Sequence, residues 1–238
     1  MNSRIDVMLD FGSGARRVGE LFLLEKRGRH VFAYDRKFLS TGLQISPLTM
    51  PLGPGTFEAP KERDLYDLHG VFADSLPDEW GRRVQDAEFE KAGIVDPTSL
   101  TRLSYVGRFG IGALQYEPAL HFSEGHDAVA LATLRKATLR LLEGTVESVS
   151  RQLLQSGGSA GGARPKFLVD MNELTGEIRY TRGVADMPFR PVLLKVPQRG
   201  DDQWQRLEHL YCQLARACGI TVPDTWLLTA SDSSLVHF

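Results

Sequence analysis

The sequence predicts an α+β protein made of two successive units. Three observations point to this fold class: short apolar runs near the start, helix-compatible segments after residue 67, and a second series of short strands after residue 166. The chain has 238 residues, 42% of them hydrophobic, which suffices for one large or two small cores. We therefore expect a small sheet or barrel-like unit with helices, followed by an antiparallel sheet with one main helix.

The first unit begins with strands. Apolar runs at Ile5–Leu9, Val18–Leu24 and Val31–Ala33 are separated by glycine and charged clusters, a pattern typical of hairpins. The next stretch, residues 46–60, is rich in proline and glycine, which predicts an irregular loop.

Helices follow this loop. Residues 67–76 and 78–92 are both helix-compatible, and Asp78 after a proline marks the second helix start. Asp96 before a proline is a further capping signal, and apolar residues at helical spacing follow it. A strand is expected to return over residues 110–116, which completes a compact α+β unit.

The composition changes near Gly125, where we place the boundary between predicted domains 1–125 and 126–238. Residues 128–142 are rich in alanine and leucine and predict a helix. Beyond them we expect strands at 166–171, 178–181 and 192–196, a helix at 203–218 and a strand at 226–229. Three strands, a helix and a strand is the order found in the small lobe of a protein kinase.

Composition excludes several functions. A formal charge of −2 does not fit a dedicated nucleic-acid-binding protein. Cys212 and Cys218 point to different faces of a predicted helix, so they cannot form a disulfide, which fits a reducing cytoplasm. No apolar run approaches membrane-spanning length, and the start lacks a signal-peptide core. The histidines show no ligand spacing, so we expect no metal site.

A glycine-rich segment precedes the second series of strands. Its backbone amides, together with two cations, are suited to binding the phosphates of a nucleotide. On the glycines alone, a flexible linker is an equally good interpretation, and the cations favour the phosphate site. The residues of this predicted phosphate loop are Ser159, Ala160, Gly161, Gly162, Ala163, Arg164 and Lys166.

Lys195 lies in an apolar strand, where a lysine loses hydration unless an acid or anion compensates it. A water-facing lysine on an edge strand between prolines is the alternative. On the following helix, Glu208 borders an apolar stripe, which we expect to pack near the sheet. Glu208 is therefore predicted to orient Lys195 toward phosphate, although a solvated helix-face glutamate is more common. The stripe consists of Leu207, Leu210, Tyr211 and Leu214.

Taken together, these segments resemble the HipA family of toxin–antitoxin serine/threonine kinases. In the second half the likeness rests on Ser159–Lys166, Leu194–Pro197, Glu208–Tyr211 and Gly219–Pro223. In the first half it rests on Val18–Leu21, Phe72–Gly81 and Val106–Leu114. The resemblance thus extends over nearly the whole chain.

The resemblance implies catalytic roles for Lys195 and Glu208, and autophosphorylation of Ser159. It implies ATP with Mg²⁺ as the cofactor of the complete family member. It also implies a HipB-like helix-turn-helix antitoxin as partner, DNA contact only through that antitoxin, and a protein substrate of the aminoacyl-tRNA synthetase class. No membrane partner is expected.

The sequence departs from the family pattern at its end. The catalytic aspartate and the metal-binding asparagine and aspartate of the family would lie beyond Phe238, and the two asparagines present are Asn2 and Asn172. We therefore expect a chain shortened by nature or by design, without the large catalytic lobe, with no stably bound ATP and little phosphoryl transfer. The alternatives are a stand-alone, antitoxin-like module that docks on a separate kinase, and a decayed pseudokinase.

Overall fold

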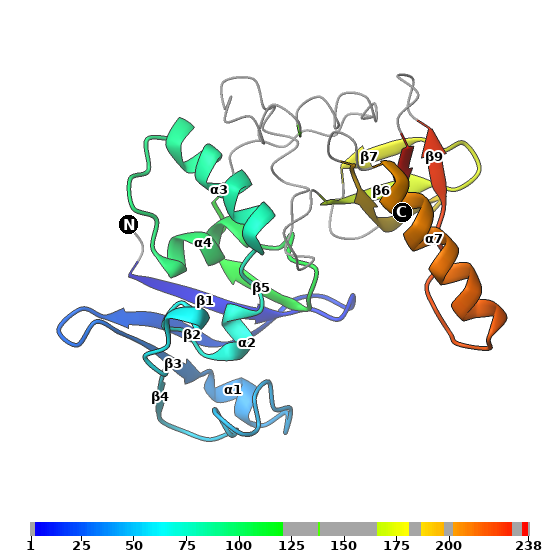
Figure 1. Cartoon of the computed structure of the whole chain (residues 1–238). Helices are drawn as coiled ribbons and strands as arrows, with labels where there is room; N and C mark the ends of the chain where they lie inside the picture. Colours follow the sequence, from blue (N-terminus) through cyan, green and yellow to red (C-terminus); the bar gives the residue numbers. More distant parts are fainter. Residues whose placement is uncertain are drawn as a thin grey trace. The chain divides into compact units, whose positions relative to one another are not determined.

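The structure is a computed structural model that describes residues 3–120, 138, 166–180, 187–197, 202–229 and 235–237. Its two antiparallel sheets and intervening helices confirm the predicted α+β class (Figure 1). Two compact units are present: Met1–Pro77 with Phe89–Phe122, and Asp78–Glu88 with Ser123–Phe238. Gly125 lies outside the described residues, so the boundary placed there stays a prediction.

The first sheet has the strand order β4-β3-β2-β1-β5, with every neighbouring pair antiparallel. Its strands are β1 (Arg4–Leu9), β2 (Arg16–Leu24), β3 (Arg29–Tyr34), β4 (Thr56–Glu58) and β5 (Leu114–Glu117). Strand β4 lies inside the stretch 46–60 that we predicted to be a loop. That prediction is wrong for its three residues, because threonine and phenylalanine can pair at a sheet edge between prolines.

The helices of the first part of the chain differ in length. They are α1 (Arg36–Leu39), the 3₁₀-helix η1 (Arg63–Leu65), α2 (Gly70–Ala73), α3 (Glu79–Lys91) and α4 (Ser99–Val106). The helix expected over 67–76 is reduced to α2. Tyr66 and Asp67 adopt φ angles of 56° and 55°, and these left-handed conformations interrupt the helix before Gly70.

Side chains cap the two longer helices. The Asp78 Oδ1 atom accepts a hydrogen bond of 2.8 Å from the Gly81 amide in the first turn of α3, as its sequence signal indicated. Before α4 the cap is Thr98, whose Oγ1 accepts from the Thr101 amide at 3.1 Å. The capping role predicted for Asp96 is thus taken by a residue two positions later.

The core of the first unit lies on one face of its sheet. Alternate residues of β1 are buried there, as the period of a strand requires, and short helices cover them. Its buried members are Ile5, Val7, Leu9, Val18, Leu21, Phe32, Tyr34, Phe38, Met50, Leu68, Phe72, Leu76, Leu100, Leu103 and Tyr116. Burial raises the pKa of the Tyr116 hydroxyl, which donates a hydrogen bond of 2.6 Å to Ser75 Oγ.

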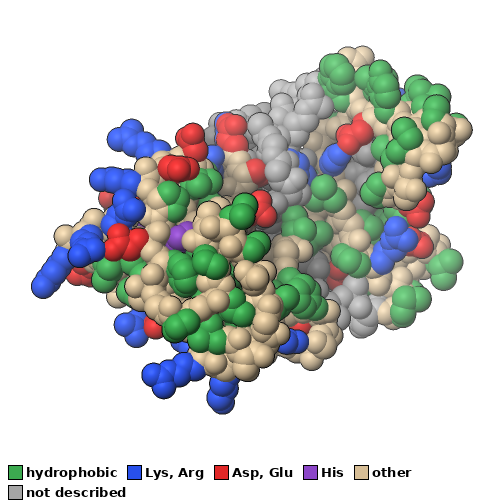
Figure 2. Space-filling view, turned by 90° about the horizontal axis from the view of Figure 1, so that it is seen from below, with side chains coloured by type: hydrophobic (Ala, Val, Ile, Leu, Met, Phe, Trp, Pro, Cys, Tyr) green, Lys and Arg blue, Asp and Glu red, His purple; other side chains and the backbone are tan. Residues whose placement is uncertain are grey.

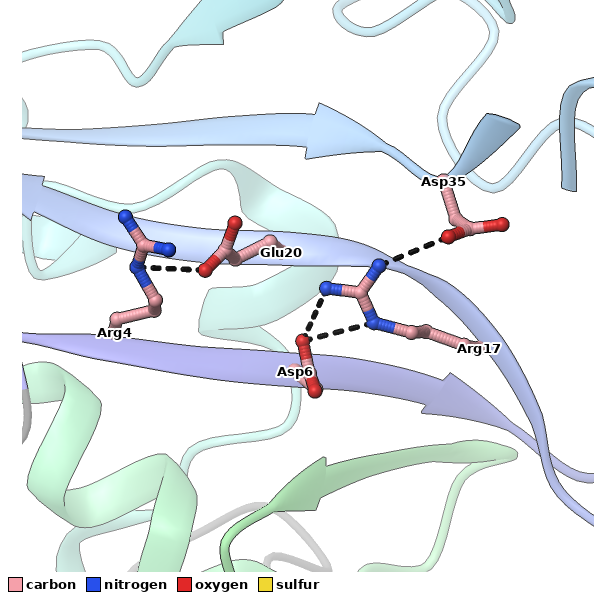
Figure 3. A network of polar contacts seen from close by, with 5 residues as sticks. All are labelled: Arg4, Asp6, Arg17, Glu20 and Asp35. Carbon is pink, nitrogen blue, oxygen red and sulfur yellow. Dashed lines mark hydrogen bonds and ion pairs between the residues drawn. The ribbon is translucent and has the colours of Figure 1, made fainter. Parts of the chain in front are cut away.

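The alternate residues of β1 carry an ion-pair network instead (Figure 3). Arg17 Nε donates to Asp6 Oδ1 and Arg17 Nη1 donates to Asp35 Oδ2, each at 2.9 Å. Arg4 Nε lies 2.7 Å from Glu20 Oε1. Pairs as exposed as these contribute about 1 kcal/mol or less each, so apolar burial rather than this network stabilises the unit.

The second sheet has the order β7-β6-β8-β10-β9. Its elements are β6 (Lys166–Asn172), β7 (Ile178–Tyr180), β8 (Phe189–Lys195), α7 (Asp202–Ala217), β9 (Leu227–Thr229) and β10 (Leu235–His237). The predicted order of three strands, a helix and a strand is present. No large catalytic lobe is found among the described residues, and none of their helices is long and apolar enough to cross a membrane.

Gly19 is a position where the fold requires glycine. A Cβ atom built there would lie 2.2 Å from the Ala33 carbonyl oxygen and 2.6 Å from the Phe32 ring. We expect Gly19→Ala to lower the free energy of unfolding by about 2 kcal/mol, because backbone and ring must move. Gly70→Ala is the matched control, since a Cβ atom at that position would have no neighbour within 4 Å. Urea unfolding that leaves the two variants equally stable would contradict this packing.

His69 makes the first unit sensitive to acid. Burial lowers the pKa of its imidazole, although the hydrogen bond to the Phe57 carbonyl opposes this shift. Its Nε2 atom lies 3.1 Å from that carbonyl, and Nδ1 is buried without a partner among the described residues. The unfolded state therefore takes up a proton first, and stability is lost as the pH falls below about 6.5.

We expect urea unfolding midpoints to fall between pH 7 and pH 5, and to fall less steeply in His69→Gln, whose amide can still donate to Phe57. Equal slopes in the two proteins would exclude His69 as the source of the acid sensitivity.

Candidate functional site

The candidate site lies at the end of β8, where Lys195 forms an ion pair with Glu208 of α7. Lys195 is the last residue of its strand, and its side chain is 32% exposed, while that of Glu208 is 45% exposed. The predicted pairing of these two residues is therefore present in the fold. Both groups remain accessible, so an anion could reach the ammonium without rearrangement of the sheet.

Helix α7 is anchored on the side that faces β9 and β10. His209 contacts Thr225 Oγ1 through Nδ1 at 2.8 Å, and Gln213 Nε2 lies 2.8 Å from its other ring nitrogen. One turn later, Arg216 Nη2 donates to the Pro223 carbonyl at 2.9 Å. These contacts fix the rotation of the helix about its axis, and so the direction of the neighbouring Glu208.

The apolar stripe of α7 does not pack on the sheet as predicted. Its residues are exposed to between 39% for Leu207 and 64% for Tyr211, whereas Gln205 is buried. Figure 2 shows hydrophobic side chains, in green, at the right-hand end of the view, where Figure 1 places α7. Glu208 nevertheless pairs with Lys195 at the end of β8.

Lys166, which we predicted to be a phosphate ligand, has a carboxylate partner in the fold. Its Nζ donates a hydrogen bond of 3.1 Å to Asp78 Oδ2, and both side chains are less than 10% exposed. Asp78 is 88 residues away in sequence but belongs to the same compact unit. Sequence reasoning recognised Asp78 as a helix cap and missed this second role, which no local pattern signals.

A second buried carboxylate lies on β6. Asp170 is fully buried, and Arg179, its register partner on β7, places Nε 3.5 Å from its Oδ2. The Arg179 guanidinium also stacks 3.9 Å from the centre of the Phe189 ring. The sequence signal for this pair is an aspartate in the middle of an apolar strand. Its cross-strand geometry gives it a structural role in holding β6 and β7 together.

The predicted phosphate loop from Ser159 to Arg164 lies outside the described residues, and its role stays a prediction. Among the residues that the structure does describe, no group of three His, Cys, Asp or Glu side chains could hold a metal ion. Both cysteines are free.

Comparison with known proteins gives two family matches in succession along the chain. The HipA N-terminal domain model matches residues 9–117, and the HipA-like C-terminal domain model matches residues 158–237. A search of curated proteins found no significant match.

Among solved structures, the fold is similar to a chain of the Shewanella oneidensis MR-1 toxin–antitoxin complex of HipA, HipB and its operator DNA. The TM-score is 0.60 at 16% sequence identity, over 97% of this chain and 49% of that chain. The chain thus spans about half the length of this relative. Because both of its halves match HipA domain models and its fold matches as well, the chain belongs to the HipA family.

Proposed function

We propose that this chain is the N-terminal portion of a HipA-type serine/threonine protein kinase, and that its second unit contacts the phosphates of ATP. The observation that carries the proposal is the Lys195–Glu208 ion pair at the end of β8. An ammonium group has three N–H donors, so one bond to Glu208 leaves donors for phosphate oxygens. The Glu208 carboxylate fixes the direction of the Lys195 side chain but uses only one of its N–H donors.

The energetics of the pair favour a functional role. With 32% and 45% of the two side chains exposed, the pair contributes at most about 1 kcal/mol to folding. Stability alone therefore gives little reason to place a lysine at the end of an apolar strand. A bound polyphosphate would compensate its charge far better, through charge-assisted hydrogen bonds.

Phosphoryl transfer is proposed for the whole protein rather than for these 238 residues. The match spans 49% of the HipA chain, and the resemblance assigns the catalytic aspartate and the Mg²⁺ ligands to a large lobe. In this proposal the chain contributes phosphate contacts, with Ser159 as the autophosphorylated residue. The other half contributes the base and the metal ion.

We further propose a HipB-like antitoxin as partner, since the similar structure contains HipA, HipB and operator DNA. A net charge of −2 favours DNA contact through that antitoxin rather than by this chain. A cytoplasmic location and an aminoacyl-tRNA synthetase as substrate complete the proposal, and both rest on the family resemblance.

The exposed apolar side of α7 favours a second candidate function, a module that docks on a separately encoded kinase. The two candidates differ in what Lys195 does. In the kinase portion, nucleotide binding depends on Lys195. In the docking module, binding through the apolar residues of α7 does not depend on Lys195.

Lys195→Met tests the phosphate contact. We expect ATP affinity to fall about tenfold or more, because a charged hydrogen bond to phosphate is lost. The free energy of unfolding should change by less than about 1 kcal/mol, because the pair is exposed. Calorimetric titration with ATP and urea unfolding measure the two quantities. Lys61→Met, at an exposed lysine of the first unit, is the control, and equal ATP affinity in both variants would remove the assignment.

Antitoxin binding is tested by co-expression with a HipB-like helix-turn-helix protein from the same genome. We expect the tagged chain to retain it through affinity purification and gel filtration, at a constant ratio. Operator DNA should join the complex only when the antitoxin is present. Separate elution of the two proteins would argue against this partner.

A further inference from the structure

Lys166 and Lys195 face each other directly across the antiparallel strands β6 and β8. Residues opposite each other in such a pair project from the same face of the sheet, with their Cβ atoms about 5 Å apart. Like charges in this arrangement repel each other and destabilise the sheet unless acids compensate them. Each lysine has such an acid: Asp78 for Lys166 and Glu208 for Lys195.

The two ion pairs differ in burial. The side chains of Lys166 and Asp78 are 7% and 8% exposed, against 32% and 45% for Lys195 and Glu208. Both oxygens of Asp78 are also occupied, one by the Gly81 amide and one by the Lys166 ammonium. The buried pair is therefore fixed in place, while the exposed pair can respond to a ligand. Charges interact most strongly where water is excluded. The Asp78 carboxylate therefore acts more strongly on the Lys166 ammonium than an exposed acid would.

We propose that Asp78 is a positioning residue for Lys195: by pairing with Lys166, it leaves Glu208 to Lys195 and so keeps the Lys195 ammonium oriented. Without the Asp78 carboxylate, two facing cations would compete for Glu208 at this end of the strands. The effect on phosphate binding rests on the proposed function, whereas the effect on Lys195 itself does not.

The first part of the test measures the state of Lys195 by NMR of the full chain with ¹³C-labelled lysine, the Lys195 signal being assigned through Lys195→Arg. Among the residues whose side chains the structure describes, the titratable groups around Lys195 are Lys166 on β6 and Glu208 on α7. Asp78→Asn removes the charge, but asparagine is still a good helix cap. We expect the Lys195 side-chain signal to move toward that of a solvated lysine, because Lys166 then competes for Glu208.

The matched variant is Asp78→Asn with Lys166→Met, which removes both charges of the buried pair and keeps an aliphatic side chain in place of the lysine stem. We expect the Lys195 signal to return to its wild-type position in this double variant. A role limited to capping α3 would not produce that rescue. An unchanged Lys195 signal in Asp78→Asn, or one that stays displaced in the double variant, would overturn the proposal.

Lys166→Met alone decides the matter if Asp78→Asn does not fold. It removes the competing cation, so the Lys195 signal is expected to keep its wild-type position, and a shift toward a solvated lysine would contradict the proposal. ATP titration of the same variants provides the second part: affinity should drop about tenfold in Asp78→Asn, because the oriented hydrogen bond from Lys195 to phosphate is lost, and should recover in the double variant. If the wild-type chain binds no ATP, the proposed phosphate contact fails for this chain. The NMR results still test whether Asp78 positions Lys195.

Discussion

The second unit is organised around two lysines that its strand register places directly opposite each other. Lys166 and Lys195 occupy the first position of β6 and the last of β8, so any antiparallel pairing in this register brings their charges together. The fold meets this constraint with carboxylates from two different helical segments. One is Asp78, in the turn that starts α3, and the other is Glu208 on α7. Each cation at this end of the strands thus has a carboxylate of its own.

Burial separates the two pairs into different tasks. The Lys166–Asp78 pair is nearly inaccessible, and removing one partner of such a pair leaves a costly buried charge. The Lys195–Glu208 pair is open to solvent and adds little to stability. This division suits reversible binding of an anion. Lys166 is fixed by its buried partner, while the Lys195 ammonium remains accessible from solvent.

The first unit follows simpler rules. One face of its sheet carries a continuous apolar core under short helices, and the other carries exposed ion pairs such as Arg17 with Asp6 and Asp35 (Figure 3). Gly19 allows the Phe32 ring to lie against the sheet at the centre of this core. In the second unit α7 departs from this pattern, since Gln205 is buried while the apolar stripe of the helix is exposed.

Sequence alone indicated the α+β class, the succession of three strands, a helix and a strand in the second unit, and the pairing of Lys195 with Glu208, because these depend on local periodicity and on a charge within an apolar strand. It could not locate β4, the interruption before α2 or the exposed side of α7, since edge pairing, left-handed residues and helix rotation depend on neighbours distant in sequence. It also could not reveal the Asp78–Lys166 pair. Only the tertiary fold brings Asp78, a helix cap, next to Lys166, a strand end 88 residues away. Because both side chains are buried there, loss of either charge would leave the other one unpaired and costly.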